Sequence, residues 1–318
     1  QEYYRAGFLK CLNSGLLQDR KFKVVVDYSY SPASQILPDL LGELGVETVG
    51  LYAHTSANRV SRTASELKQA LNELSRIVIT LKADVGFLMD NGAEKLYLVD
   101  ESGQVLSHEE ALVVVGLLCA HASGAEVLAY PVHGSSALEK LASSKGAAVF
   151  RTPVNPRHLL DYARRPNVGF VGDADGGFIF PRFQPAFDAM FAIAHILEML
   201  ASHGGSIGAL REHAASQIRV LHRRVPCPWS HKGQVMRFAQ LAAKGHKVEL
   251  VDGVKIHKPD GWVLVLPDGD EAFCHVWAEA ETEKAARGYL DEYSHKVDEW
   301  QSADENSSTD TAAAVGTD

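Results

Sequence analysis

Cysteine is scarce in this sequence, and a long apolar run is missing from it. The four cysteines among the 318 residues are Cys11, Cys119, Cys227 and Cys274, and no two of them form a CxxC pair. We therefore expect neither a cysteine-based zinc site nor a disulfide framework, and reduced thiols fit a cytoplasmic protein. No segment reaches the roughly 18 apolar residues that span a bilayer, so we expect no membrane partner.

An excess of basic residues is also lacking. There are 31 Lys and Arg against 40 Asp and Glu, which gives a net charge of −9. A nucleic-acid-binding protein presents a basic face, so we expect no nucleic-acid partner. At about 150 residues for each domain, the length suggests two domains or three small ones. The chain starts at Gln1 rather than Met, inside a helical pattern, which suggests a piece cut from a longer protein.

The first part of the chain alternates between strand and helix patterns. Lys23–Asp27 is a short β-branched run that suits a buried parallel strand. Further patterns predict strands at 46–52, 85–89 and 96–99, and helices over 36–44 and from Ser65 to Leu74. This order indicates an open α/β sheet over residues 1–106.

The pattern restarts at Ser107 and gives a second α/β unit over residues 107–203. Its predicted helices cover 111–122, 136–145, 159–165 and 187–201, and its strands cover 127–132, 147–152, 168–171 and 178–180. A predicted linker at 203–205 marks the start of the third domain, residues 204–300. There, helices at 234–243 and 283–293 with strands at 248–250, 262–266 and 274–278 indicate a smaller α+β domain with an antiparallel sheet. Residues 301–318 are rich in Ser, Thr, Asp and Ala, so we expect a disordered acidic tail.

Three short polar loops accompany these units, at 90–95, 172–177 and 266–272. In this order they resemble the loops of the α-D-phosphohexomutase family, the phosphomannomutases and phosphoglucomutases. The resemblance covers Tyr3 to Trp300 and starts at the family's second domain. It implies two consecutive α/β domains, with mixed sheets and helices on both faces, followed by the family's domain IV. It implies no counterpart of the domain whose serine carries the phosphate, and hence no catalytic residue. Thr63-Ala64-Ser65-Glu66 resembles that serine motif only faintly, and a helix N-cap explains it better.

The family's metal loop reads D-G-D-x-D-R and holds Mg²⁺ with three carboxylates. Here Asp90 and Glu94 keep two acids, Gly92 replaces the middle one, and Lys95 replaces the arginine. The resemblance implies a weakened or lost Mg²⁺ site at Asp90 and Glu94, with Lys95 toward the substrate, and no other cofactor. Asn91-Gly92 between apolar runs is equally typical of a plain β-hairpin.

The family's sugar loop reads G-E-x-S-G-H. Here Asp173 replaces the glutamate, Asp175 replaces the serine, and the histidine is absent. The resemblance implies weak sugar contact through Asp173 and Asp175. A glycine-rich turn between two strands explains the same residues.

The family's phosphate loop reads R-P-S-G-T-E-P. Here Leu266 replaces the arginine, Asp268 and Asp270 flank Gly269 in place of the two hydroxyls, and Glu271 follows. A phosphate dianion would meet three acids and no cation in this loop, so we expect no phosphate grip. Because a polar loop between strands usually lies at the surface, we also expect Leu266→Arg with Asp268→Ser and Asp270→Thr to restore affinity at little cost in stability.

Two further stretches narrow the resemblance: Val225–Trp229 with Lys232-Gly233, and the acidic loop running into His275–Glu279. They are similar to the degenerate mutase-like C-terminal half of bifunctional mannose-1-phosphate guanylyltransferases. This implies a nucleotidyltransferase domain of the same parent chain as partner, hexose phosphate as ligand, and a regulatory or assembly role. Two alternatives stay open. One is a fragment of a working mutase that interconverts hexose 1- and 6-phosphates, and the other is a ligand-free α/β interaction module.

Overall fold

The computed structural model describes residues 2–56, 61–122 and 127–303 of the chain. The chain divides into two compact units, Gln1–Ile218 and Arg219–Asp318, which we describe separately. In the described ranges, no helix combines the length and apolarity needed to cross a membrane.

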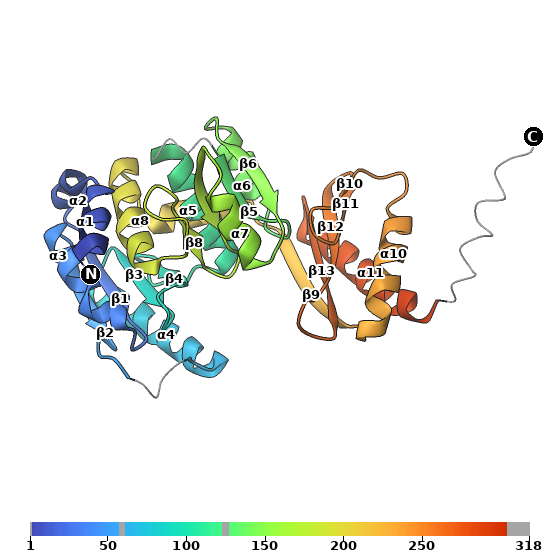
Figure 1. The fold of residues 1–318 in the computed structure, drawn as a ribbon, viewed down its shortest axis with the longest axis horizontal. Coiled ribbons are helices and arrows are strands. Elements are labelled where there is room, and N and C mark those ends of the chain that lie inside the picture. The colour runs from blue at the N-terminus through green and yellow to red at the C-terminus, as the bar shows by residue number, and fades with distance from the viewer. Residues whose placement is uncertain (1, 57–60, 123–126, 304–318) are drawn as a thin grey trace, which may run out of the picture. The chain divides into compact units, whose positions relative to one another are not determined.

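The first half of unit 1 is an α/β layer built on a four-stranded sheet (Figure 1). Its elements are α1 (Glu2–Lys10), α2 (Ser14–Arg20), β1 (Lys23–Asp27), the 3₁₀ helix η1 (Pro32–Gln35), α3 (Leu37–Glu43), β2 (Glu47–Leu51), α4 (Ala64–Leu81), β3 (Val85–Met89) and β4 (Leu96–Val99). The strand order is β2-β1-β3-β4, with β1 parallel to β2 and β3, and β4 antiparallel to β3. The strands at 23–27, 85–89 and 96–99 are thus confirmed.

The second half of unit 1 repeats this topology. Its elements are α5 (His108–Ala122), β5 (Val127–Pro131), α6 (Ala137–Ser143), β6 (Ala148–Thr152), α7 (Pro156–Ala163), β7 (Val168–Gly172), β8 (Phe178–Ile179), α8 (Ala189–His203) and α9 (Ile207–Ala215). The strand order is β6-β5-β7-β8, again with the last strand antiparallel to its neighbour. The loop between the third and fourth strand therefore occupies the same place in each half.

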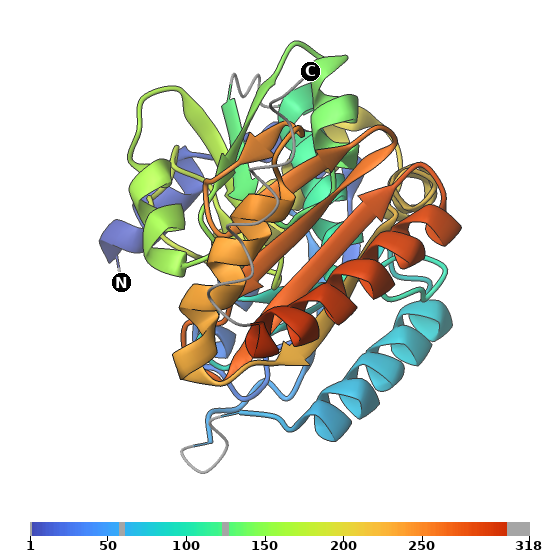
Figure 2. The ribbon, with the colours of Figure 1, turned by 90° about the vertical axis from the view of Figure 1, so that its right-hand side faces the viewer.

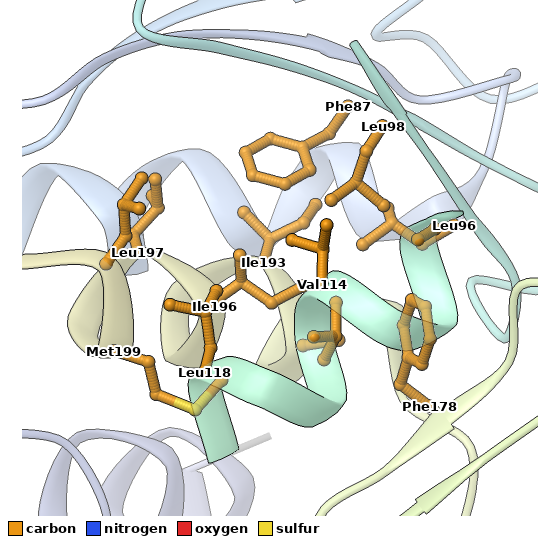
Figure 3. Close-up of a cluster of buried hydrophobic side chains, with 14 of the residues drawn as sticks. Phe87, Leu96, Leu98, Val114, Leu118, Phe178, Ile193, Ile196, Leu197 and Met199 are labelled. Atoms are coloured by element: carbon orange, nitrogen blue, oxygen red, sulfur yellow. The ribbon is translucent and has the colours of Figure 1, made fainter. Parts of the chain in front are cut away.

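One hydrophobic core joins the two halves of unit 1 (Figure 3). Phe87 and Leu98 of the first sheet, Val114 of α5, Phe178 of β8 and Ile193 of α8 belong to this one cluster. Helix α8 is buried at every position from Phe191 to Leu200, as expected of a helix that is mainly apolar all round. This shared core fixes the loops of the two halves relative to each other.

Unit 2 is an antiparallel sheet covered by two helices. Its elements are β9 (Val220–Pro226), α10 (Trp229–Ala242), β10 (Val248–Glu249), β11 (Val254–Lys258), β12 (Gly261–Pro267), β13 (Phe273–Ala280) and α11 (Glu283–Ser302), with strand order β10-β11-β12-β13-β9. Figure 2 shows α10 and α11 on the same face of the sheet. Val235 of α10 and Val297 of α11 pack there against Val263 and Val276.

Two sequence-based boundaries differ from the structure. The third domain was expected to begin at residue 204, but α9 packs with α5 in unit 1, and the division between the units falls after Ile218. Helix α11 continues to Ser302, beyond the expected start of the tail at 301, and the rest of that tail, 304–318, lies outside the described residues.

The N-cap interpretation of Thr63 is confirmed. The Thr63 hydroxyl accepts the Glu66 N–H at 3.3 Å, and the Glu66 carboxylate accepts the Thr63 N–H at 2.8 Å. This capping box starts α4 and leaves no reason to read the segment as a serine motif.

Candidate functional site

The structure brings the expected metal loop and sugar loop together at one edge. Residues 90–95 join β3 to β4, and residues 173–177 join β7 to β8. The Leu96 N–H donates to the Gly176 carbonyl at 2.9 Å, and Lys95 and Gly177 form an antiparallel bridge. The Lys95 ammonium lies 3.6 Å from the Asp175 carboxylate. Lys95 and Asp175, predicted separately as substrate-binding residues, thus contact each other.

The metal loop is a tight hairpin turn organised by Asp90. One Asp90 carboxylate oxygen accepts the N–H groups of Glu94 at 2.7 Å and Lys95 at 2.9 Å. Glu94 is exposed. Across the described ranges, no three His, Cys, Asp or Glu side chains are grouped to hold a metal ion. Asp90 and Glu94 are oxygen donors of the kind Mg²⁺ takes, but one Asp90 oxygen is already occupied by two N–H groups of its own turn.

The sugar loop buries its first acid. Asp173 is only 9% exposed, and its carboxylate accepts backbone N–H groups of Asp175 and Ala174. Burial, together with the negative charge of Asp175, raises the pKa of Asp173 to about 6, while Lys95 acts in the opposite direction. Asp175 is itself largely exposed. Asp173 is therefore a carboxyl group that changes charge close to neutral pH.

Sequence reasoning missed two ring side chains beside these loops. The Tyr97 ring on β4 lies 5.0 Å from the His108 ring at the start of α5. Burial lowers the pKa of His108. The positive charge of Lys95 lowers it too, whereas the negative charge of Asp175 acts in the opposite direction. Only the position of His108 at a helix start could have drawn attention to it, because its neighbours come from other segments.

The third loop lies in unit 2, and Asp268 organises it. One Asp268 carboxylate oxygen accepts the N–H groups of Asp270 at 2.7 Å and Glu271 at 2.8 Å, and the other accepts from His275 Nε2 at 2.8 Å. These bonds, the Asp270 N–H foremost, lower the pKa of Asp268. Leu266 lies inside β12 and is 7% exposed. The premise that Leu266 belongs to a surface loop is therefore wrong, whereas the stability cost of the three substitutions stays a prediction.

Cations do reach this loop, contrary to the expectation of none. The Lys232 ammonium on α10 donates to the carbonyls of Asp268 at 2.6 Å and Glu271 at 2.5 Å. The Arg224 guanidinium on β9 pairs with the Glu271 carboxylate. Both cations come from segments over 35 residues away in sequence, so the loop motif alone could not reveal them. Asp270 donates its backbone N–H to Asp268.

Two histidines and a tryptophan lie beside this loop, His222 on β9 and His275 and Trp277 on β13. His222 Nε2 and His275 Nδ1 are 2.9 Å apart, and the Trp277 ring stacks on both imidazoles, with centroids 4.5 and 4.9 Å away. Burial lowers the pKa of His222 to about 4, with His275 and Arg224 adding to the effect. Asp268, His275 and His222 thus form one hydrogen-bonded chain.

Comparison with protein families matches unit 1 in two segments. Residues 2–103 match "Phosphoglucomutase/phosphomannomutase, alpha/beta/alpha domain II", and residues 109–217 match domain III of the same description. The second match ends close to the division between the two compact units.

Curated relatives and solved structures extend the similarity over most of the chain. A Thermococcus kodakarensis protein named "Phosphoglucomutase/phosphomannomutase" is 31% identical over 276 residues, which cover 86% of this chain and 60% of that protein. A Methanopyrus kandleri protein named "Probable phosphoglucosamine mutase" is 29% identical over 273 residues, 85% of this chain and 60% of that one. The crystal structure of a Burkholderia thailandensis phosphoglucomutase/phosphomannomutase family protein matches the fold, with a TM-score of 0.77 at 17% identity, over 94% of this chain and 64% of that chain. The chain thus spans about three fifths of the length of these curated relatives.

Proposed function

Residues 2–103 and 109–217 match domains II and III of the phosphoglucomutase/phosphomannomutase family, so the chain belongs to that family. We propose that it is a phosphohexomutase-like module that has lost mutase chemistry. In this proposal the module binds hexose phosphate weakly and does not interconvert hexose 1- and 6-phosphates by itself. It acts as a regulatory or assembly part of a sugar-1-phosphate nucleotidyltransferase, in cytoplasmic nucleotide-sugar metabolism.

The observation that carries the proposal is the loop at 266–272. A phosphate dianion there would face the carboxylates of Asp268, Asp270 and Glu271. Two like charges ~4 Å apart repel by about 1 kcal/mol in water and by several times more near a protein surface. The two cations that reach the loop are already engaged, Lys232 by two carbonyls and Arg224 by Glu271. A bound phosphate would have to break those contacts.

The loops of unit 1 support the same conclusion. Phosphoryl transfer depends on positioning and on positive charge around the transferring group. At the junction of the two loops, the Lys95 ammonium is paired with Asp175, and one oxygen of Asp90 is held by its own turn. Little positive charge remains there to stabilise a phosphoryl group.

The nucleotidyltransferase role rests on the stretch Val225–Trp229 with Lys232-Gly233 and on the acidic loop. In the structure these two stretches are in contact, because Lys232 holds the loop and the Cys227 N–H donates to the Ala272 carbonyl at 2.9 Å. The two stretches that resemble the mutase-like half of the guanylyltransferases therefore lie side by side in the fold. The alternative, a fragment of a working mutase, draws support from the names of the relatives and from the intact scaffold.

A coupled assay on the full 318-residue chain tests the proposal. With mannose 1-phosphate, glucose 1-phosphate and a hexose 1,6-bisphosphate activator, we expect no turnover above the blank, while the Thermococcus kodakarensis relative serves as the comparison enzyme. Calorimetry should show that mannose 1-phosphate binds no more tightly than a millimolar dissociation constant. Turnover by the chain alone would support the working-mutase alternative and overturn the proposal.

The parent chain separates the remaining alternatives. If the coding sequence before Gln1 encodes a nucleotidyltransferase start of the G-x-G-T-R-L-x-P type, the proposed role is supported. A mutase serine loop before Gln1 would contradict it.

A further inference from the structure

We propose that His222 and His275 form a two-histidine site for a divalent transition-metal ion, of the Zn²⁺, Cu²⁺ or Ni²⁺ class, on strands β9 and β13 of unit 2. The site is distinct from the loops at 90–95 and 172–177. It does not depend on any hexose phosphate being bound.

The first argument is the geometry of the two imidazoles. In the antiparallel register His222 pairs with Trp277 and His275 pairs with Arg224, so the two histidines are diagonal neighbours on one face of the sheet. Their rings are 17° from parallel, with centroids 5.1 Å apart and His222 Nε2 only 2.9 Å from His275 Nδ1. The two ring nitrogens, on nearly parallel rings, therefore face each other at hydrogen-bond distance. Both cannot carry a proton there, so at least one presents a lone pair.

The second argument is the carboxylate behind His275. Histidines that bind metals usually donate their other ring N–H to a carboxylate, carbonyl or water, which fixes the tautomer and raises ligand basicity. His275 Nε2 donates to Asp268 at 2.8 Å, and Asp268 is held in place by the N–H groups of Asp270 and Glu271. With its proton on Nε2, His275 presents the lone pair of Nδ1 toward His222, where a metal ion could bind it.

The third argument is the surrounding charge and packing. Asp268 lies against His275, and Arg224 is close enough to His222 to lower the pKa of that imidazole. Arg224 is paired with Glu271 and lies over the Phe273 ring at 4.2 Å, so its charge is partly compensated. Trp277 lies nearly parallel to both imidazoles and keeps the rings aligned.

The ligand type selects the metal. Imidazole nitrogen suits Zn²⁺, Cu²⁺ and Ni²⁺, whereas Mg²⁺ takes oxygen ligands. No third His, Cys, Asp or Glu of the described chain joins a group that could hold a metal ion, so water completes the coordination. On binding, the ion replaces the hydrogen between the two rings, and the proton of His222 Nε2 moves through solvent to Nδ1. No net proton is released, and no electron is transferred.

Metal titration of the full chain tests this proposal. With ZnCl₂ and CuCl₂ in calorimetry, we expect a site that His222→Ala or His275→Ala weakens at least tenfold. Asp268→Asn should weaken it about 10- to 100-fold, as is usual for such carboxylate partners. His257→Ala is the matched control, because His257 donates its Nε2–H to Glu249 at 2.6 Å in the same sheet, and this variant should leave the affinity unchanged.

Spectroscopy keeps the test decisive if a variant folds poorly. Copper electron paramagnetic resonance of the unsubstituted chain should show two coordinated imidazole nitrogens at the tightest site, and His222→Gln should reduce these to one. Tryptophan fluorescence checks folding, since all four tryptophans lie at residue 229 or later. No binding at micromolar metal, or binding that survives both histidine substitutions, would overturn the site. Neither result would bear on the mutase assay.

Discussion

Asp173 is a residue at which burial sets the chemistry. Asp173 follows the buried strand β7 directly, and its pKa is raised from 3.8 to about 6, first by burial and then by Asp175. The folded chain therefore holds this proton more tightly than the unfolded chain does. The resulting stability is complete below the unfolded pKa and is lost as the pH rises through about 6. At neutral pH the ionised carboxylate gives up this contribution.

We predict that Asp173→Asn removes this pH dependence. A pKa shift from 3.8 to about 6 corresponds to roughly 3 kcal/mol at most. Urea unfolding followed by far-UV circular dichroism, at several pH values between 4 and 7, should show unit 1 losing stability with rising pH in the unsubstituted chain. The variant should show a smaller loss over the same range. Equal slopes in the two proteins would mean that Asp173 titrates normally.

The contact between the two loops of unit 1 depends on a backbone conformation at Gly176 that favours glycine. Gly176 has a φ of +90°, and a Cβ on it would lie 2.7 Å from the Leu96 carbonyl oxygen, which is backbone and cannot yield. Gly92, in the facing loop, has no such φ, and the nearest atom to its Cβ would be 3.5 Å away. The two glycines thus differ in what they allow.

We predict that Gly176→Ala destabilises unit 1 by about 1–3 kcal/mol, because a side chain at positive φ is strained and the β4 pairing must shift. Gly92→Ala, the matched control, should change stability by less than about 0.5 kcal/mol. Amide hydrogen exchange at Leu96 locates the effect, since its N–H donates to Gly176. Unchanged protection of that amide in Gly176→Ala would contradict the argument.

The elements that the sequence predicted and those it missed differ in where their stability comes from. β1 and β3 were found because their own residues form continuous apolar runs. α9 was missed because Ile207 and Leu210 are buried by packing with α5, far away in sequence, and the preceding His-Gly-Gly suggests a linker. β9 was missed because its exposed positions carry histidine and arginine rather than a β-branched run.

The same distinction holds for the candidate site. Asp90, Asp173 and Asp268 were found from loop motifs, which are local. The cations that contact the third loop were not, because Lys232 and Arg224 reach it only through helix packing and strand pairing. A motif identifies residues that are neighbours in sequence. The charge balance at the loop also depends on residues that are distant in sequence and become neighbours only in the folded chain.

At the scale of the whole molecule, unit 1 is a repeat, and the repeat explains why its two loops meet. Each half has the same strand order, so the turn after its third strand falls at the same edge of its sheet. Asp90 and Asp173 both follow a third strand directly, and both bind the N–H groups of their own loop. Mutase chemistry needs more than this edge, since the phosphate loop belongs to unit 2. Restoring a single loop should therefore restore binding but not turnover.

We predict that Gly92→Asp raises Mg²⁺ affinity at least tenfold, or about 1.4 kcal/mol, without creating mutase activity. The substitution returns the middle acid between Asp90 and Glu94, and the space around Gly92 accepts a Cβ in ordinary contact. Gly92→Ala, which adds the Cβ without the charge, should leave the affinity unchanged. Calorimetry measures the binding, and Mn²⁺ paramagnetic broadening of the residue 90–95 amide signals locates it. If Gly92→Asp binds Mg²⁺ no better than Gly92→Ala, the hairpin rather than the missing acid prevents metal binding. If it gives turnover, the acidic loop of unit 2 does not exclude phosphate, and the proposed loss of mutase chemistry would have to be abandoned.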